Sequence, residues 1–279
     1  MNISKVKKLL QSSDLNAKKK YGQNFLIDDN ILKTISESLE KTPYVIEIGP
    51  GLGSLTEYLL KNYDKVLAYE IDQDMINILK QNFNENLIIK EQDFLKANID
   101  QDIYDIFKTD NINLIANLPY YITTPIIIKI LEESKAINQM TIMVQKEVGE
   151  RLLGHTKTKE YNSLSVLIQT YMKVSKVINV SRNAFYPSPN VDSVVIKLQR
   201  KEKVEYDIYN EALFKKINRL LFSQRRKTIV NNLKTIYNKD KILLMLNNLD
   251  IKETQRSEEL SIKQIIDIAN YIERSGMND

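Results

Sequence analysis

The sequence predicts an α/β protein in which an open, mostly parallel sheet with helices on both faces precedes a small all-helical domain. From about residue 42, short apolar runs alternate with amphipathic helical stretches, which is the pattern of strand-helix-strand units. Two later runs of alternating character, separated by a Pro-rich loop, predict an antiparallel pair that completes the sheet. Beyond residue 207 only helical periodicity remains.

The predicted elements follow one another in a regular order. Parallel strands are expected at 44–49, 65–71, 86–93, 112–120 and 140–147, with helices over 55–63, 74–83 and 124–134. The antiparallel pair is expected at 174–181 and 191–199, and the tail helices at 211–222 and 262–273. Because a charged segment at 199–207 separates the two patterns, we expect one domain over residues 1–200 and a second over 201–279.

Composition excludes several kinds of chemistry. The chain of 279 residues contains no Cys and one His, His155, which rules out thiol nucleophiles and disfavours both a His-based metal site and a catalytic triad. No metal is therefore expected. The chain shows no apolar segment of signal-peptide or membrane-spanning length, so we expect a cytoplasmic protein without membrane contact. Nothing in the sequence suggests more than a monomer.

A glycine-rich turn directly follows the first strand. The stretch "EIGPGLGSLTEYL" places glycines at 49, 51 and 53, and Glu70 ends the next strand. Glycine allows a sharp turn and close approach of a ligand to the backbone, and an acid at the next strand end can bind ribose hydroxyls. Both a dinucleotide and S-adenosylmethionine fit this arrangement. The third glycine lies two residues after the second rather than three, which favours S-adenosylmethionine and disfavours an NAD-dependent oxidoreductase.

Polar residues also follow the third and fourth strands. Asp93 lies where a carboxylate can accept a hydrogen bond from an adenine amino group, although it could equally cap the next helix. The stretch "NLPYYITTP" starts at Asn117, where open α/β sheets bind ligands. The Asn117 side-chain carbonyl and the Leu118 backbone carbonyl can accept the two hydrogens of a planar amino group, while Pro119 fixes the backbone and Tyr120 stacks on a base.

Such a site suits methylation of an adenine amino group in an unpaired or extruded base. Catalysis would then depend on positioning and charge complementarity, and the proton can leave to water afterwards. Phe185, in "NAFYPSPNVDSVV", is placed to stack on the other face of the base. The alternative for Phe185 is a loop aromatic that caps the core.

The ordered set of motifs resembles the ribosomal RNA adenine dimethyltransferases, which have a Rossmann-like methyltransferase sheet. The matching stretches are "KKKYGQNFL", "VIEIGPGLGSLTEYL", "YEID", "DFL", "NLPYYITTP", "VQKEV", "FYPSP" and "LFSQRRKT", and they span nearly the whole chain. The last resembles the bacterial small-subunit enzymes more than the antibiotic-resistance enzymes that methylate large-subunit RNA.

This resemblance implies transfer of two methyl groups to each of two adjacent adenosines in a hairpin loop near the 3′ end of 16S rRNA. The cofactor is S-adenosylmethionine and its product is S-adenosylhomocysteine. Carried over by position, the cofactor-binding residues are Asn24, Leu26, Gly49, Gly51, Glu70, Asp93 and Asn117. Alternatives are a large-subunit (23S) methyltransferase and a catalytically silent RNA-binding assembly factor.

The densest basic cluster of the tail is "SQRRKT", with Arg225, Arg226 and Lys227. A solvated helix face is the ordinary explanation for such a run, but we expect contact with rRNA phosphates here. Residues 18–20, "KKK", would add a second basic strip. The loop "LGHTKTKEYNSLSV" departs from the family pattern, because Asn162 replaces a usual glycine and the loop carries His155.

Overall fold

The computed structural model describes residues 24–277, which fall into two compact units. Unit 1 contains residues up to Gly149 together with Ser175–Arg200, and unit 2 contains Glu150–Val174 together with the segment from Lys201 onward. The basic strip expected at 18–20 and the first part of "KKKYGQNFL" lie outside the described residues. No helix in the described range is long and apolar enough to span a bilayer.

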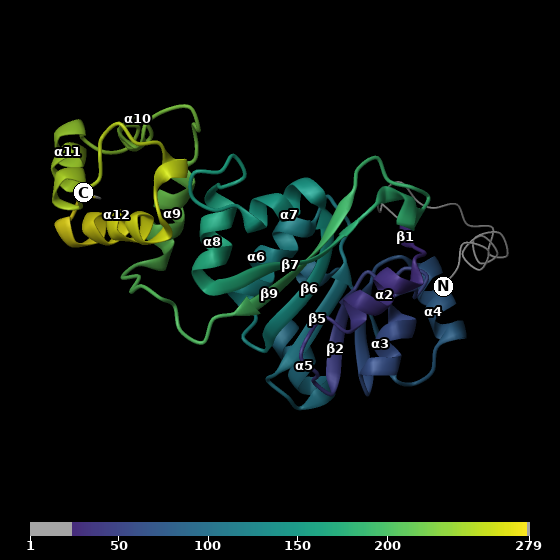
Figure 1. Cartoon of the computed structure of the whole chain (residues 1–279). Coiled ribbons are helices and arrows are strands. Elements are labelled where there is room, and N and C mark those ends of the chain that lie inside the picture. The colour runs from purple at the N-terminus through teal and green to yellow at the C-terminus, as the bar shows by residue number, and fades with distance from the viewer. Residues whose placement is uncertain (1–23, 278–279) are drawn as a thin grey trace. The chain divides into compact units, whose positions relative to one another are not determined.

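The main sheet has seven strands in the order β4-β3-β2-β5-β6-β9-β7. Figure 1 labels β2, β5, β6, β9 and β7 of this sheet. The strands are β2 (Tyr44–Ile48), β3 (Lys65–Glu70), β4 (Leu87–Glu91), β5 (Ile112–Asn117), β6 (Ile137–Gln145), β7 (Met172–Val180) and β9 (Ser193–Arg200). Strands β2 to β6 are parallel, and β9 runs antiparallel to β6. The predicted strands and the antiparallel end of the sheet are confirmed.

Helices cover both faces of this sheet (Figure 1). Those that lie wholly in unit 1 are α2 (Asp29–Ser36), α3 (Thr56–Asn62), α4 (Gln73–Asn82), α5 (Ile99–Phe107) and α6 (Thr123–Glu133), with the short 3-10 turns η2 (Phe94–Lys96) and η3 (Arg182–Ala184). Helix α7 (Lys146–Leu153) begins in unit 1 and crosses its boundary at Gly149. Side-chain caps start two of the helices: Asp28 accepts from the amides of Asn30 and Ile31, and Asp72 from that of Asp74. Both caps satisfy amides that the helix itself leaves unpaired.

One face of the sheet forms a hydrophobic core with α2, α3 and α4. Alternate strand residues such as Val45, Val66 and Ile115 are fully buried there, together with Leu32 of α2 and Leu59 of α3. The intervening residues point to the opposite face because strand side chains alternate. Burial on both faces explains why the parallel strands appear in the sequence as continuous apolar runs.

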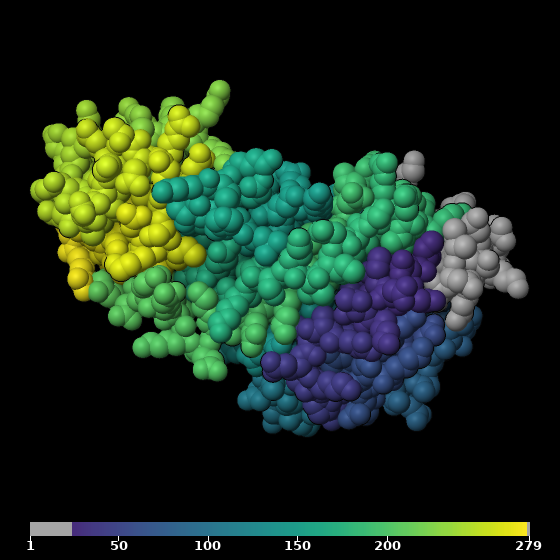
Figure 2. Space-filling model, viewed as in Figure 1, coloured from purple at the N-terminus to yellow at the C-terminus, as the bar shows by residue number. Residues whose placement is uncertain are grey.

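A separate pair of two-residue strands lies in unit 1, near the carboxyl ends of the parallel strands. Strand β1 (Phe25–Leu26) pairs antiparallel with β8 (Phe185–Tyr186). In the space-filling view, the segment of β1 and α2, in purple, lies along the surface of unit 1. Beside it lies the green part of the chain that includes β8 (Figure 2). This pairing brings residues 24–26 and 185 together across a long stretch of chain, and the sequence pattern did not predict it.

Unit 2 is helical. It contains α8 (Ser163–Tyr171), α9 (Glu211–Leu221), α10 (Ile229–Leu233), α11 (Lys239–Asn248), η4 (Ser257–Glu259) and α12 (Ile262–Ser275). It differs from the domain expected over 201–279 by including residues 150–174. The Asn218 side chain of α9 donates to the Ser163 carbonyl at the start of α8, and the Tyr161 and Phe222 rings pack edge to face. These contacts attach residues 150–174 to the tail helices.

Close packing between α7 and β9 gives a test of the fold. A Cβ at Gly149 would lie 2.1 Å from Cγ1 of Val194, a distance at which the side chain or the helix must shift. We expect Gly149→Ala to lower the free energy of unfolding in urea by about 1–3 kcal/mol. The loss should be clearly smaller when Val194→Ala is also present, and equal losses in both backgrounds would contradict this packing.

Candidate functional site

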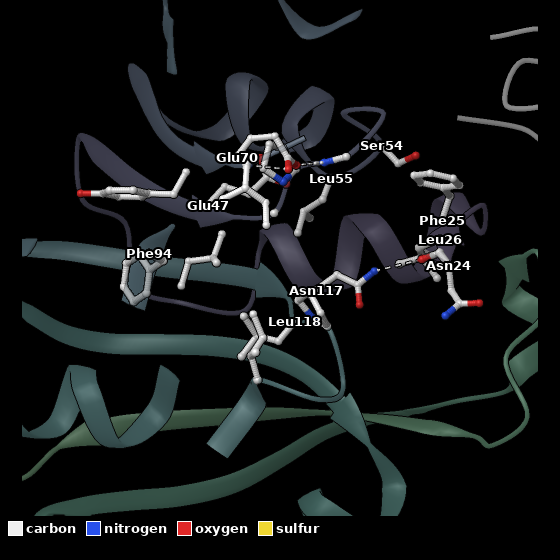
Figure 3. Close-up of a pocket in the computed structure, with 18 of the residues that line it drawn as sticks. Asn24, Phe25, Leu26, Glu47, Ser54, Leu55, Glu70, Phe94, Asn117 and Leu118 are labelled. Atoms are coloured by element: carbon white, nitrogen blue, oxygen red, sulfur yellow. Dashed lines mark hydrogen bonds between the residues drawn. The ribbon is translucent and has the colours of Figure 1, made fainter. Parts of the chain in front are cut away.

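All of the predicted cofactor-binding and catalytic residues line one pocket of unit 1, at the carboxyl ends of the parallel strands (Figure 3). They are Asn24, Leu26, Gly49, Gly51, Glu70, Asp93, Asn117, Leu118, Pro119, Tyr120 and Phe185. The sheet brings them together because β2, β3, β4 and β5 all end at this edge. This is the edge at which open α/β sheets bind ligands.

The glycine-rich turn between β2 and α3 favours glycine at each of its three positions. The φ angles of Gly49, Gly51 and Gly53 are +65°, +55° and +81°, values that other residues rarely adopt. The position of a Cβ at Gly49 has nothing within 4 Å, whereas one at Gly51 would lie 3.1 Å from the Phe25 ring. Gly49 thus leaves open space on the pocket wall, where a ligand can approach the backbone closely.

Glu70 connects this turn to the end of β3. One of its carboxylate oxygens accepts from the amides of Ile71 and Asp72, at 2.8 and 2.9 Å, and the other accepts from the amide of Gly51 at 3.1 Å. Figure 3 labels Glu70 where it lines the pocket. Burial raises the pKa of Glu70, while the three amides oppose that rise. A rigid acceptor therefore faces the pocket beside the glycine turn.

Asp93 was expected either to accept a hydrogen bond from a ligand or to cap the next helix, and its position in the structure allows both. Its Oδ1 accepts from the amide of Leu95 at 2.9 Å, so it caps η2, and its side chain also lines the pocket. The other carboxylate oxygen accepts no hydrogen bond from the described residues. Asp93 can therefore cap η2 and accept a hydrogen bond from a ligand at the same time.

Asn117, the last residue of β5, is oriented by the segment that enters β1. Its side-chain amide nitrogen donates to the backbone carbonyl of Asn24 at 3.5 Å (Figure 3). Among the described residues, neither the Asn117 side-chain carbonyl nor the Leu118 backbone carbonyl accepts a hydrogen bond. The following carbonyl, that of Pro119, is already used by Ile122 and Thr123. Within the described part of the chain, two neighbouring acceptors are thus left open at the pocket.

The two predicted stacking residues have different surroundings. Tyr120 is half-buried, and its hydroxyl lies 2.9 Å from Oγ of Ser193. Burial raises the pKa of this hydroxyl, so it stays protonated. Phe185 is only 4% exposed and belongs to the core cluster that includes Leu26 and Leu32, although it also lines the pocket. Phe185 therefore caps the core, and only a small part of its ring faces the pocket.

Glu47 is a pocket residue that the sequence analysis missed. It lies in β2, is 1% exposed, and accepts a hydrogen bond from the Thr56 hydroxyl at 2.6 Å. Burial raises its pKa to about 8, and the nearby charge of Glu70 adds to the rise. The sequence does contain a signal for this residue, because Glu47 is an acid within an otherwise apolar strand, two residues before Gly49 of the glycine turn.

The predicted RNA-binding residues belong to unit 2. Arg226 and Lys227 are exposed, whereas Arg225 forms an ion pair with Glu258, with Nε 2.7 Å from Oε2. Arg225 also donates to the carbonyl of Thr158 at 3.4 Å. Arg225 therefore joins the loop 154–162 to η4. Arg226 and Lys227 form no ion pair with the described residues.

The loop that departs from the family pattern is well defined. Asn162 caps α8 by accepting from the amides of Leu164 and Ser165, and the Ser165 hydroxyl accepts from the Asn162 amide. The asparagine in place of glycine thus makes a capping box. His155 is exposed in this loop, as expected for a solvated residue.

Comparison with known proteins supports the interpretation of the motifs. Residues 14–274 match the family model described as ribosomal RNA adenine dimethylase. A protein of Macrococcus caseolyticus named ribosomal RNA small subunit methyltransferase A is 41% identical, covering 97% of this chain and 95% of its own length. A Mycoplasmopsis pulmonis protein of the same name is 46% identical, with coverages of 85% and 92%.

A solved structure has the same fold. The crystal structure of a dimethyladenosine transferase from Plasmodium falciparum superposes with a TM-score of 0.75 at 29% sequence identity. The match covers 91% of this chain and 98% of the other. The predicted sheet, with its antiparallel end and the helices that follow, is therefore that of a methyltransferase fold.

The burial of Glu47 predicts a specific pH dependence of the free energy of unfolding. Its pKa rises from 4.5 to about 8 on folding, so between these values the unfolded chain loses the Glu47 proton while the folded protein keeps it. Stability therefore falls as the pH rises through this window, at up to about 1.4 kcal/mol per pH unit. In Glu47→Gln we expect that fall to be absent, with the variant equal to the wild type near pH 4.5 and more stable at pH 8.

Urea unfolding at four or five pH values between these limits measures the effect. Glu37→Gln, on the exposed surface, serves as the control for a general effect of replacing an acid. Parallel stability curves for the wild type and Glu47→Gln would show that Glu47 is ionised in the folded protein.

Proposed function

The chain belongs to the ribosomal RNA adenine dimethylase family, and we propose that it dimethylates the 6-amino groups of two adjacent adenosines in a hairpin loop near the 3′ end of 16S rRNA. Its substrate is the small ribosomal subunit or a precursor of it, so the reaction takes part in subunit biogenesis. Relatives that are 41% and 46% identical are named for the small subunit, which favours this RNA over the 23S RNA of the alternative.

The observation that carries the proposal is the pair of open acceptors at Asn117 and Leu118. An adenine amino nitrogen attacks poorly, because its lone pair is delocalised into the ring while the group stays planar. Two carbonyls that accept its hydrogens hold the group in place and favour pyramidal geometry at nitrogen. The bond from Asn117 to the Asn24 carbonyl keeps the amide nitrogen turned toward Asn24, so the side chain presents an acceptor without further reorganisation.

The residues around the glycine turn fit S-adenosylmethionine, which supplies an electrophilic methyl group when bound. Glu70 offers carboxylate oxygens for the ribose hydroxyls, and the second oxygen of Asp93 offers an acceptor for the adenine amino group. Gly49 leaves space for close approach of the ligand, and Asn24 and Leu26 complete the pocket wall with Gly51. Asn117 borders both the cofactor site and the target site.

No strong base is needed for this reaction. Once methylated, the amino nitrogen carries a positive charge and is acidic enough to release its proton to water. Tyr120 and Phe185 supply apolar surface for an adenine taken out of its stack, and Pro119 restricts the backbone between the acceptors and Tyr120. The rate thus depends on positioning.

The complete pocket also favours an enzyme over a silent assembly factor. A protein that only binds RNA has no need of the positive φ angles at the glycine turn, the buried acceptor of Glu70 or the pair of open carbonyls. We further propose that the protein acts as a monomer in the cytoplasm, where small subunits are assembled.

Removal of the Asn117 acceptor tests the reaction and its substrate together. Wild-type protein is expected to transfer labelled methyl groups from S-adenosylmethionine to unmethylated 30S subunits and to leave 50S subunits unlabelled, with dimethyladenosine in 16S rRNA as the product. Asn117→Ala should lower the rate at least about 100-fold, because an oriented dipole at the reacting group is removed. Asn111→Ala, at the exposed amino end of β5, is the matched control and should retain activity.

Each other outcome points to a different function. Label on 50S subunits alone would make this a large-subunit methyltransferase. Cofactor binding without label on either subunit would support the assembly factor. Full activity of Asn117→Ala would remove Asn117 from the mechanism.

The exposed cations of unit 2 are proposed to contact rRNA phosphates. We expect the double variant Arg226→Ala with Lys227→Ala to reduce the slope of log affinity against log salt by about one for each phosphate that the variant no longer neutralises. Arg225 is left intact because its ion pair with Glu258 also holds the protein together. The control replaces Lys239 and Lys241, which are exposed on α11; an equal change of slope in both variants would argue against a specific contact.

A further inference from the structure

The Tyr120 hydroxyl makes a contact that the mechanism proposed above does not use. Its hydroxyl lies 2.9 Å from the Oγ of Ser193, the first residue of β9. Ser193 is 0% exposed, whereas Tyr120 is half-buried and lines the pocket. A buried hydroxyl without a partner is costly, so this contact satisfies Ser193 and at the same time fixes the outer end of the Tyr120 ring.

Ser193 is itself held firmly in place. It pairs with Gln145 at the end of β6, and the preceding carbonyl, of Asp192, accepts from the Lys146 amide at 3.0 Å. The Asp192 side chain accepts from the Arg182 amide, also at 3.0 Å. On the other side, Val194 packs directly against Gly149 of α7. The anchor therefore belongs to the rigid end of the sheet and not to a loose loop.

The contact reaches across one strand of the sheet. Tyr120 follows β5 and Ser193 starts β9, and β6 lies between these two strands. Because β9 runs antiparallel to β6, its amino end lies at the same edge as the carboxyl ends of the parallel strands. The chain from Phe185 to Ser193 thus carries one of the two predicted stacking residues and the anchor of the other.

We propose that Ser193 is a positioning residue that holds the Tyr120 ring as a fixed wall for the target adenine. This inference rests on the proposed function and adds a residue to it. With its hydroxyl tied, the ring cannot rotate into the pocket or out to solvent, so stacking of the base does not have to order it first. The base then meets the acceptors at Asn117 and Leu118 in the reactive orientation, where small displacements cost large factors in rate.

A double-variant cycle tests the proposal. We expect Ser193→Ala and Tyr120→Phe each to lower kcat for methylation of 30S subunits by about tenfold, while the affinity for S-adenosylmethionine, measured by calorimetry without RNA, is unchanged. The double variant should be no slower than the slower single variant, because both changes remove the same hydrogen bond. Wild-type kcat in Ser193→Ala, or losses that multiply in the double variant, would overturn the proposal.

A matched serine variant separates positioning from general destabilisation. Ser134 is also buried, at 2% exposure, and its hydroxyl bonds to Asp100 at 2.6 Å; the residue is not part of the pocket lining. Ser134→Ala is expected to lower the melting temperature and to keep the wild-type kcat. A fall in kcat comparable to that of Ser193→Ala would mean that the effect at Ser193 reflects lower stability, which would also overturn the proposal.

A measurement that needs no activity separates this proposal from the proposed function. In protein labelled with 3-fluorotyrosine, the resonance of Tyr120 is identified by its absence in Tyr120→Phe. We expect Ser193→Ala to shift this resonance toward the position of a freely rotating ring. If the resonance does not shift, Ser193 does not position Tyr120, even if the wild type methylates 30S subunits. If the resonance shifts but the wild type methylates neither subunit, the positioning by Ser193 is supported and the proposed reaction is rejected.

Discussion

The pocket depends on the contact between the Glu70 carboxylate and the backbone around it. A carboxylate buried at the end of β3 is stable only if its oxygens are satisfied, and the amides of Gly51, Ile71 and Asp72 do this. One of those amides belongs to the glycine turn that follows β2, so the acid fixes the turn as well as itself. The positive φ angles of the turn make that close approach possible. The hydrogen bond from Gly51 to Glu70 therefore requires three things together: neighbouring strands β2 and β3, glycines in the turn after β2, and an acid at the end of β3.

The Asn117 side of the pocket depends on a different long-range contact. The short pairing of β1 with β8 brings the backbone carbonyl of Asn24 close to the side chain of Asn117. This carbonyl accepts a hydrogen bond from the side-chain amide nitrogen of Asn117. The carbonyl of the same side chain is then left for a ligand. A segment near the start of the chain thus sets the chemical character of a residue at the end of β5, and it does so through backbone atoms, which any residue at position 24 would supply.

Much of this could be predicted from the sequence, and the parts that could not share a physical reason. Periodicity and turn residues are local signals, so the strands and the glycine turn were predictable, and the motif order located Glu70, Asp93 and Asn117. The pairing of Phe25 with Tyr186 rests on two residues in each strand, too few for a periodic signal. The elevated pKa of Glu47 depends on burial, and the inclusion of residues 150–174 in unit 2 depends on contacts such as Asn218 with Ser163. These are properties of the folded chain.

The basic turn of unit 2 illustrates how far structure changes the meaning of a charge run. Its backbone is held from inside: the Asn232 side chain donates to the carbonyls of Leu221 and Gln224, and the Ser257 hydroxyl donates to that of Leu221. Asn232 and Ser257 are almost fully buried, so this part of the turn is as well packed as a core. A flexible basic segment loses conformational entropy when it binds a polyanion, whereas a turn that is already ordered loses little. Within the run "SQRRKT", Asn232 thus holds the backbone at Gln224 and Glu258 pairs with Arg225, while the side chains of Arg226 and Lys227 stay exposed.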